Sequence, residues 1–330
     1  TNTIDVAAAA RRAVFVANVP GKNAVAVAEL TMGLILSLDR RIPENVAEAR
    51  AGTWNKQVFS KAEGLMGKTL GIVGLGQIGT AVAERAAAFG MRVITVERSR
   101  TAEDTERLRE LGIETVPDLA TLMAAADVIT VHVPAGAATK RLIDADLLQH
   151  VRPGAILINT SRGDVLDEGA VLAAIEAKGL RVGIDVFEGE PADGAGAFES
   201  NLAQHPGVYT THHIGASTSQ AQEAIASEVV AMIRDYQRGV LRNVVNLTPP
   251  SPDGTILVVR HYDRVGVLSA VLEGLRADGL NVQDMQNLVF AGAGAAVASI
   301  HVEGQISDRV RTEIGNHPDV IHLTVRPAPA

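Results

Sequence analysis

Hydrophobic and polar positions follow a regular alternation through the middle of the chain. From Gly67 onward, short apolar runs are separated by amphipathic segments typical of helices, such as A81-V-A-E-R-A-A-A-F89. Near-continuous apolar strands between helices predict a parallel sheet covered on both faces. The runs expected to form its strands are L70-G-I-V73, V93-I-T-V96, V128-I-T-V-H-V133, A155-I-L-I158, V182-G-I-D-V186 and V208-Y-T-T211. We therefore expect an α/β fold with a doubly wound parallel sheet.

Two flanking regions depart from this pattern. The first 60 residues read as helices, and A28-E-L-T-M-G-L-I-L-S-L38 is apolar on most sides, which predicts a helix buried between domains or between subunits. Near the C-terminus, L247-T-P-P-S-P-D-G254 combines prolines with Asp-Gly and predicts a linker. The residues beyond it read β-α-β-β-α-β and begin with the strand T255-I-L-V-V259. A small separate C-terminal domain is expected.

Composition narrows the partners and the compartment. The 330 residues carry a net charge of −8 and contain 3% aromatic residues. Nucleic acid and anionic membranes attract basic surfaces, so neither is expected as a partner. The apolar stretches are far shorter than the roughly 20 residues that cross a bilayer. The absence of cysteine excludes disulfides and thiolate chemistry, and it fits a cytoplasmic location.

A glycine-rich turn follows the first strand of the expected sheet. L70-G-I-V-G-L-G-Q-I-G79 places Gly74, Gly76 and Gly79 in G-x-G-x-x-G spacing at the start of a helix. The first glycine permits a sharp bend, the second lets a pyrophosphate approach the backbone, and the third lets the helix pack on the strand. The amides of Gln77 and Ile78 would meet the phosphate charge. The motif predicts a dinucleotide site, the alternative being a purely structural turn.

The next strand ends at Glu97, which bears on the kind of dinucleotide. An acidic side chain here accepts hydrogen bonds from the adenosine ribose hydroxyls and favours NAD as the cofactor. Arg98 and Arg100 follow in V96-E-R-S-R100 and could pair with a 2′-phosphate, so NADP stays open. The two arginines could equally be solvated loop residues.

Three polar side chains follow later strands. Arg162, Glu190 and His213 each lie just beyond a strand end, where ligands of doubly wound sheets bind. An arginine there can bind a carboxylate and polarise a carbonyl, and a histidine beside a carboxylate can supply the proton that reduction of a 2-keto acid requires. The set suits hydride transfer. Taken singly, Arg162 could be a surface salt-bridge residue, and Asp185 within its apolar strand could be structural.

These motifs carry a family resemblance. G-L-G-Q-I-G, I-N-T-S-R-G, D-V-F-E-G-E-P and H-I-G-A-S-T together resemble the D-isomer-specific 2-hydroxyacid dehydrogenases over most of residues 1–250. The resemblance implies that Arg162 binds the substrate carboxylate and carbonyl, that Glu190 tunes the histidine, and that His213 donates the proton. His212 occupies the position of the family's usual proline. The chain is more similar to the branch that oxidises 3-phospho-D-glycerate with NAD, the first step of L-serine biosynthesis; another 2-hydroxy acid is the alternative.

The resemblance also implies the cofactor contacts, without a metal. Asp185 is assigned to the nicotinamide carboxamide, the segments Thr160–Arg162 and His213–Ala216 to the nicotinamide, and Val133 and Pro134 to the adenosine half. The residues implied to bind NAD are Gly74, Gly76, Gln77, Ile78, Gly79, Glu97, Val133, Pro134, Thr160, Ser161, Arg162, Asp185, His213, Ile214, Gly215 and Ala216.

The C-terminal residues resemble an ACT domain, a small amino-acid-binding regulatory fold. His261 and Asp263 in H261-Y-D-R-V-G-V-L268, with Asn281, occupy the positions that bind L-serine across a subunit interface. Val265 replaces the usual proline of that loop. We expect serine inhibition, the alternative being a domain kept for oligomerisation. Trp54 in T53-W-N-K56 resembles a subunit-interface anchor, and a homotetramer is expected.

The start of the chain resembles the interior of a family motif. T1-N-T-I-D5 aligns with a segment that normally follows most of the substrate domain, so we expect the preceding part of that domain to be missing. The expected domains are a substrate-domain remnant at 1–22, a dinucleotide-binding domain at 23–215, a returning substrate segment with linker at 216–253, and the ACT domain at 254–330. A non-catalytic protein that binds NAD(H) and an amino acid is therefore an alternative to an active enzyme.

Overall fold

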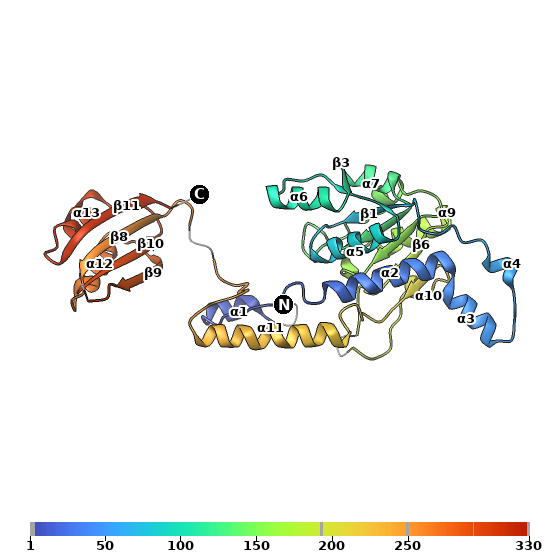
Figure 1. Cartoon of the computed structure of the whole chain (residues 1–330), viewed down its shortest axis with the longest axis horizontal. Coiled ribbons are helices and arrows are strands. Elements are labelled where there is room, and N and C mark those ends of the chain that lie inside the picture. Colours follow the sequence, from blue (N-terminus) through green and yellow to red (C-terminus); the bar gives the residue numbers. More distant parts are fainter. Residues whose placement is uncertain (1–3, 192–193, 249–250, 293, 329–330) are drawn as a thin grey trace. The chain divides into compact units, whose positions relative to one another are not determined.

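The computed structural model describes residues 4–191, 194–248, 251–292 and 294–328, which form two compact units (Figure 1). One unit is Ala17–Asn243, and the other combines Thr1–Val16 with Val244–Ala330. The first residues of the T-N-T-I-D motif, and Pro249 and Pro250 of the expected linker, lie outside the described residues.

The larger unit is built on a seven-stranded, all-parallel sheet with strand order β3-β2-β1-β4-β5-β6-β7. The strands are β1 (Thr69–Val73), β2 (Arg92–Val96), β3 (Ile113–Val116), β4 (Val128–Val131), β5 (Ile156–Asn159), β6 (Arg181–Ile184) and β7 (Val208–Thr210). The expected doubly wound parallel sheet is confirmed, and all six predicted strands are present. The edge strand β3 was not predicted.

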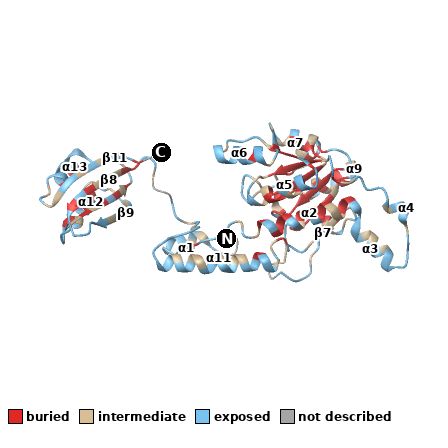
Figure 2. Ribbon diagram, in the orientation of Figure 1, coloured by how far each residue is buried: buried red, intermediate tan, exposed pale blue. Residues whose placement is uncertain are grey.

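Helices cover both faces of this sheet. The helices of this unit are α2 (Ala24–Arg40), α3 (Ile42–Arg50), α4 (Lys56–Phe59), α5 (Gln77–Ala88), α6 (Ala102–Glu110), α7 (Leu119–Ala125), α8 (Ala145–Leu148), α9 (Glu168–Lys178), α10 (Asn201–Gln204) and α11 (Ser219–Gln237), with a 3₁₀ turn, η1, at Gly163–Val165. Apolar residues of α2, α5 and α6 form the core on one face, and those of α7, α8, α9 and α10 form the core on the other. Buried residues accordingly concentrate in the strands and the sheet-facing sides of the helices (Figure 2).

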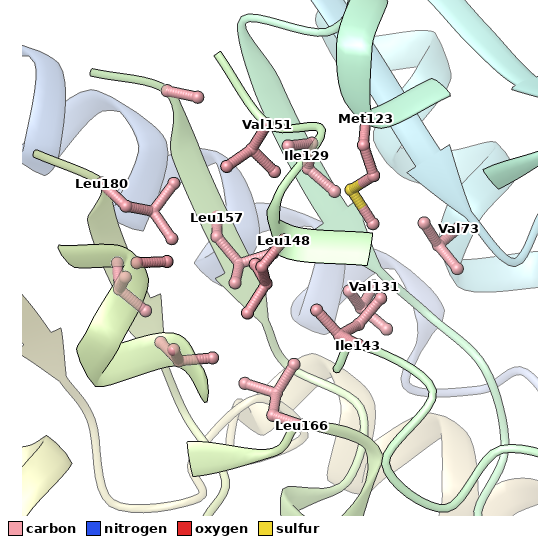
Figure 3. Packing of buried hydrophobic residues seen from close by; sticks show 14 of the residues in the cluster. Val73, Met123, Ile129, Val131, Ile143, Leu148, Val151, Leu157, Leu166 and Leu180 are labelled. Carbon is pink, nitrogen blue, oxygen red and sulfur yellow. The ribbon is translucent and has the colours of Figure 1, made fainter. Parts of the chain in front are cut away.

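Both cores are made almost entirely of aliphatic side chains. Leu157 of β5 and Ile129 of β4 are fully buried and lie with Met123 of α7 in one cluster (Figure 3). Burial of such a side chain stabilises the fold by about 1.5–3 kcal/mol. The other face is closed by α2, where Ile35 and Ala28 are fully buried. The apolar helix is thus buried as expected, but against the sheet of its own unit.

The smaller unit contains an antiparallel sheet with strand order β11-β8-β10-β9. Its elements are α1 (Val6–Arg11), β8 (Thr255–Tyr262), α12 (Val267–Ala277), β9 (Val282–Val289), β10 (Ala295–Val302), α13 (Asp308–Gly315) and β11 (Val320–Pro327). The predicted β-α-β-β-α-β order is confirmed. Val271 and Leu275 on α12 pack with Val310 and Ile314 on α13 and the inward-facing residues of β8 and β10.

Candidate active site

The predicted chemical residues gather at the carboxyl edge of the parallel sheet. Arg162, Glu190 and His213 follow β5, β6 and β7, which are consecutive neighbours in the sheet. The glycine turn follows β1, at the point where the strand order reverses between β1 and β4. Open α/β sheets bind ligands in the crevice at this switch point. The strand order therefore brings the expected dinucleotide and hydride-transfer residues to one edge.

The glycine turn has the geometry that a pyrophosphate requires. Gly74 has a φ of +99°, and a Cβ there would lie 2.6 Å from the carbonyl oxygen of His132. A Cβ at Gly79 would lie 2.3 Å from the carbonyl oxygen of Gly74, so neither position accepts a side chain. At Gly76, by contrast, a Cβ would meet no atom of the described residues within 4 Å. The N-terminus of α5, which has no side-chain cap, opens onto this free space and suits a phosphate.

The backbone carbonyl of His132 packs against the glycine turn at Gly74. His132 is buried after β4, with its Nε2 2.8 Å from Oγ1 of Thr130, while its Nδ1 has no partner among the described residues. Burial lowers the pKa of His132 to about 4, so the imidazole is neutral at physiological pH. Val133 and Pro134, the predicted adenosine contacts, follow it directly, and Val133 is half-buried against the Gly74 turn.

Glu97 lies just after β2, with an exposed side chain. Its amide donates to the carbonyl oxygen of Val116 at 2.7 Å, which extends the β2–β3 pairing and fixes the backbone. The carboxylate is thereby presented at the sheet edge, where ribose hydroxyls would be recognised.

The turn that carries Arg162 is organised by a buried asparagine. Oδ1 of Asn159 accepts hydrogen bonds from the amide (3.0 Å) and the hydroxyl (2.7 Å) of Ser161, and its Nδ2 donates to the carbonyl oxygen of Arg162 at 2.9 Å. The hydroxyls of Thr160 and Thr31 of α2 lie 3.0 Å apart and fix the start of the turn. Thr160 and Ser161 are thus buried, while Arg162 is exposed at the edge.

Gly163 places this turn against the segment that follows β6. A Cβ at Gly163 would lie 2.0 Å from the carbonyl carbon of Phe187 and 2.4 Å from the amide nitrogen of Glu188. The amide of Phe187 donates to Oε1 of Glu190 at 2.7 Å. The absence of a side chain at Gly163 therefore sets the spacing between the Arg162 turn and the Glu190 loop.

His213 contacts Glu190, as predicted. Nδ1 of His213 lies 2.6 Å from Oε2 of Glu190, and the two side chains are 49% and 30% exposed. A carboxylate accepts, so Nδ1 carries the hydrogen, and Nε2 is left as the ring nitrogen that can exchange a proton with a substrate. His213 is also one of the few non-glycine residues with positive φ, at +53°. His212 is exposed, and among the described residues its ring has no hydrogen-bond partner.

The unusual backbone of the His213 loop is held by Asp185. This carboxylate is 1% exposed and accepts from Oγ1 of Thr211 at 2.6 Å and from the amides of Ile214 and Gly215, both at 2.9 Å. The carbonyl oxygen of Asp185 accepts the His213 amide at 2.8 Å. A buried carboxylate needs such partners, since an unpaired one is costly. Asp185 thus contacts the loop directly, in addition to any contact with nicotinamide.

Sequence reasoning missed Asn159, Gly163 and Thr211 as individual contributors. The signals were present: an asparagine at a strand end is a turn former, and a carboxylate within an apolar strand requires donors nearby. Among the described residues, there is no group of three or more His, Asp or Glu side chains that could hold a metal ion. No helix in the described part of the chain has the length and hydrophobicity of a membrane span.

The candidate serine residues lie in the antiparallel unit. His261 is buried, with its ring nitrogens 2.8 Å from the carbonyl oxygen of Tyr262 and 3.1 Å from Oδ1 of Asn287. Asp263 and Asn281 are exposed. His261 pairs with Ala296, near the start of β10, whereas Val282, which follows Asn281, pairs with Val302 at the end of β10. His261 and Asn281 therefore lie at opposite ends of the sheet in one copy of the chain.

Comparison with known proteins agrees with this geometry. Residues 32–215 match the family described as D-isomer specific 2-hydroxyacid dehydrogenase, NAD binding domain. D-3-phosphoglycerate dehydrogenase of Escherichia coli (strain K12) is 36% identical over 315 residues, covering 94% of this chain and 75% of that protein. The chain belongs to the D-isomer specific 2-hydroxyacid dehydrogenases.

Other relatives act on different substrates. Glyoxylate reductase of Thermococcus litoralis is 37% identical over 262 residues, covering 76% of each protein. The structure of D-lactate dehydrogenase from Aquifex aeolicus, complexed with NAD and lactic acid, has a TM-score of 0.65 and 29% sequence identity, covering 76% of this chain and 78% of that one. Membership of the family makes this protein an NAD-dependent dehydrogenase of 2-hydroxy acids. The open Gly76 turn and the free N-terminus of α5 fit the cofactor.

Proposed function

We propose that this dehydrogenase oxidises 3-phospho-D-glycerate to 3-phosphohydroxypyruvate, the first step of L-serine biosynthesis. The observation that carries the proposal is the contact between Glu190 and His213, which follow β6 and β7. The Arg162 turn, after β5, and the glycine turn, after β1, lie at the same edge of the sheet. The name of the Escherichia coli relative, which matches nearly the whole chain, supports this choice of substrate.

The chemistry follows from the three side chains. The glycine turn and the N-terminus of α5 would hold NAD, which would supply the hydride acceptor for the carbinol carbon of the substrate. Nε2 of a neutral His213 takes the hydroxyl proton, and Glu190 stabilises the imidazolium that forms. Arg162 binds the substrate carboxylate and orients the carbon that loses the hydride. In the reductive direction, His213 returns the proton to the carbonyl oxygen.

The antiparallel unit is proposed to be an ACT domain that binds L-serine as a feedback inhibitor. Its β-α-β-β-α-β order and four-stranded antiparallel sheet support the assignment. His261 and Asp263 of one subunit would meet Asn281 of another, since the strand register places them at opposite ends of β10. Serine would then have to replace a present hydrogen-bond partner of the His261 ring, or bind beside it.

Subunit contacts are proposed to make a homotetramer. Trp54 is 88% exposed between α3 and α4, and Ile42, Val58 and Met66 of the same region are exposed as well. Aromatic side chains of this kind are typical anchors at the centre of an interface. We expect Trp54→Ala to weaken assembly, as measured by sedimentation velocity, while a tetramer with unchanged affinity would contradict this role.

The test is the oxidation of NADH by 3-phosphohydroxypyruvate, followed spectrophotometrically with and without L-serine. Turnover that serine suppresses supports both the substrate and the effector. Turnover that L-serine does not change supports the proposed substrate but not the proposed effector, and it favours an oligomerisation role for the C-terminal unit. The matched control is His213→Asn, which should lower kcat far more than it weakens NADH binding.

The second candidate is another 2-hydroxyacid dehydrogenase, and the glyoxylate reductase relative favours including it. Glyoxylate, hydroxypyruvate and pyruvate in the same assay distinguish the substrates by kcat/KM. A third candidate is a non-catalytic protein that binds NAD(H) and an amino acid. NADH binding without turnover of any of these acids would support that candidate and reject the dehydrogenase proposal.

A further inference from the structure

A hollow lies at the amino ends of the parallel strands, on the edge of the sheet opposite the candidate active site. It encloses about 320 Å³, a size that suits a small molecule. Its walls come from the last turn of α2, the loop before β1, and the residues that precede or begin β4, β5 and β6. Six charged side chains line it, namely Asp39, Glu63, Lys68, Asp127, Arg152 and Arg181.

Four of these six charges are paired with each other. Nη1 of Arg152 lies 2.8 Å from Oδ1 of Asp127, and Oδ2 of Asp127 accepts the amide of Thr69 at 2.8 Å. Lys68 pairs with Glu63. The two pairs neutralise themselves, so they do not supply a counter-ion for the two remaining charges.

Asp39 is the exception among the acids. It is 7% exposed, and the described residues give its carboxylate one hydrogen bond, from the amide of Gly64 to Oδ1 at the long distance of 3.3 Å. Its Oδ2 is left to face the hollow. A buried carboxylate that lacks donors is costly, and in the last turn of α2 this one also meets the negative end of the helix dipole. Asp39 therefore favours a cationic donor in the hollow.

Arg181, the first residue of β6, is the matching exception among the bases. Its Nε and Nη2 both donate to the carbonyl oxygen of Gly154, at 3.2 and 3.0 Å, which leaves Nη1 for another acceptor. Within the described part of the chain, Arg181 forms no salt bridge, with Asp39 or with any other acid. The hollow thus contains two opposite charges that lack counter-ions and do not pair with each other.

We propose that this hollow binds a small zwitterion of the α-amino acid class. Its ammonium group donates to Asp39, and its carboxylate accepts from Arg181 through charge-assisted hydrogen bonds. An ion of a single charge would satisfy one of the two side chains and be repelled by the other. The proposal is independent of the proposed reaction, because Arg162, Glu190 and His213 lie at the opposite edge of the sheet.

Calorimetric titration of the whole chain with glycine tests the proposal, because glycine is the smallest molecule that carries both charges at this spacing. Acetate and methylammonium carry one charge each and should bind at least about tenfold more weakly. Asp39→Asn and Arg181→Gln should each raise the Kd for glycine by about tenfold or more. Asp39→Asn should also tighten the binding of acetate, because it removes a repelling charge, and a merely damaged fold would not have this effect.

Asp146→Asn is the matched control, because Asp146 is an exposed acid in the first turn of α8, and it should leave the Kd for glycine unchanged. Asn281→Ala separates the hollow from the proposed serine site of the antiparallel unit. Glycine binding that Asn281→Ala abolishes and Asp39→Asn leaves unchanged belongs to that unit and overturns the proposal. No binding of glycine at about 50 mM, or acetate binding to the parent as tightly as glycine does, also overturns it.

Discussion

Gly163→Ala should separate the two halves of the active site without touching a reacting atom. The added Cβ would lie 2.0 Å from the carbonyl carbon of Phe187, 2.3 Å from its oxygen and 2.4 Å from the amide nitrogen of Glu188. All three atoms belong to the backbone, so no side-chain rotation relieves the overlap. Either the Arg162 turn or the segment that holds Glu190 must move.

The size of the movement can be worked from these contacts. Ordinary contacts to a Cβ begin near 3.4 Å, so the two segments must separate by about 1 Å or more. Overpacking of this kind costs about 1–3 kcal/mol of folding free energy. A misplacement of about 1 Å between catalytic groups lowers the rate by about a hundredfold. We expect kcat to fall by that order, because Arg162 and the Glu190–His213 pair lie on opposite sides of the contact.

The assay is steady-state reduction of 3-phosphohydroxypyruvate, together with urea unfolding and an NADH titration. Gly169→Ala is the control, since Gly169 lies in the first turn of α9 and its Cβ would meet Oδ1 of Asp167 only at 3.4 Å. That variant should be as active and at least as stable as the parent, because alanine favours the helix. A folded Gly163→Ala protein with the parent kcat would refute the argument that this contact sets the spacing.

Three further predictions follow from the site. Gly76→Ala should weaken NADH binding in a fluorescence titration without loss of stability, whereas Gly79→Ala should destabilise the fold in a thermal melt, because only the second Cβ overlaps protein atoms. Burial lowers the pKa of His132 to about 4, against about 6.5 in the unfolded chain. The free energy of unfolding is therefore highest above pH 6.5, where the ring is neutral in both states, and it falls with decreasing pH, by about 2 kcal/mol at pH 5. His132→Gln should remove that part of the pH dependence of urea unfolding, and an unchanged dependence would contradict it. Asp185→Asn should cost about 2 kcal/mol in urea unfolding and also lower kcat, because one buried acceptor is replaced by a donor facing amides; normal kcat with only a raised KM for NADH would instead indicate a cofactor contact alone.

The sheet could be predicted from the sequence because its central strands are buried on both faces. Runs such as V128-I-T-V131 are continuous and apolar, and this pattern is specific to a covered parallel sheet. The edge strand β3 escaped prediction for the same physical reason. Only Ile113 of its four residues is buried, while Glu114 and Thr115 face solvent, so its pattern does not stand out from a loop.

The site was only partly predictable. Strand-end residues such as Arg162 and His213 could be located because the topology places strand ends together. The hydrogen bonds that position them depend on contacts between segments distant in sequence, such as Asp185 with Gly215, which no local pattern reveals. The close packing at Gly163 is likewise hidden from local sequence patterns, because Gly163 follows β5 whereas its contact, Phe187, lies in the loop after β6.

The two carboxylates that follow from β6 divide the task of holding one histidine. Asp185 is buried and binds the loop backbone, so it fixes where the Cα of His213 lies. Glu190 is half-buried and binds the ring at Nδ1, so it fixes the tautomer and direction of the imidazole. Because both carboxylates follow β6, this one strand positions both the backbone and the ring of His213. The pairing of β5 with β6 and the close contact at Gly163 then fix the position of Arg162 relative to β6. The arrangement explains why a positive φ is tolerated at His213: the surrounding bonds over-determine the loop.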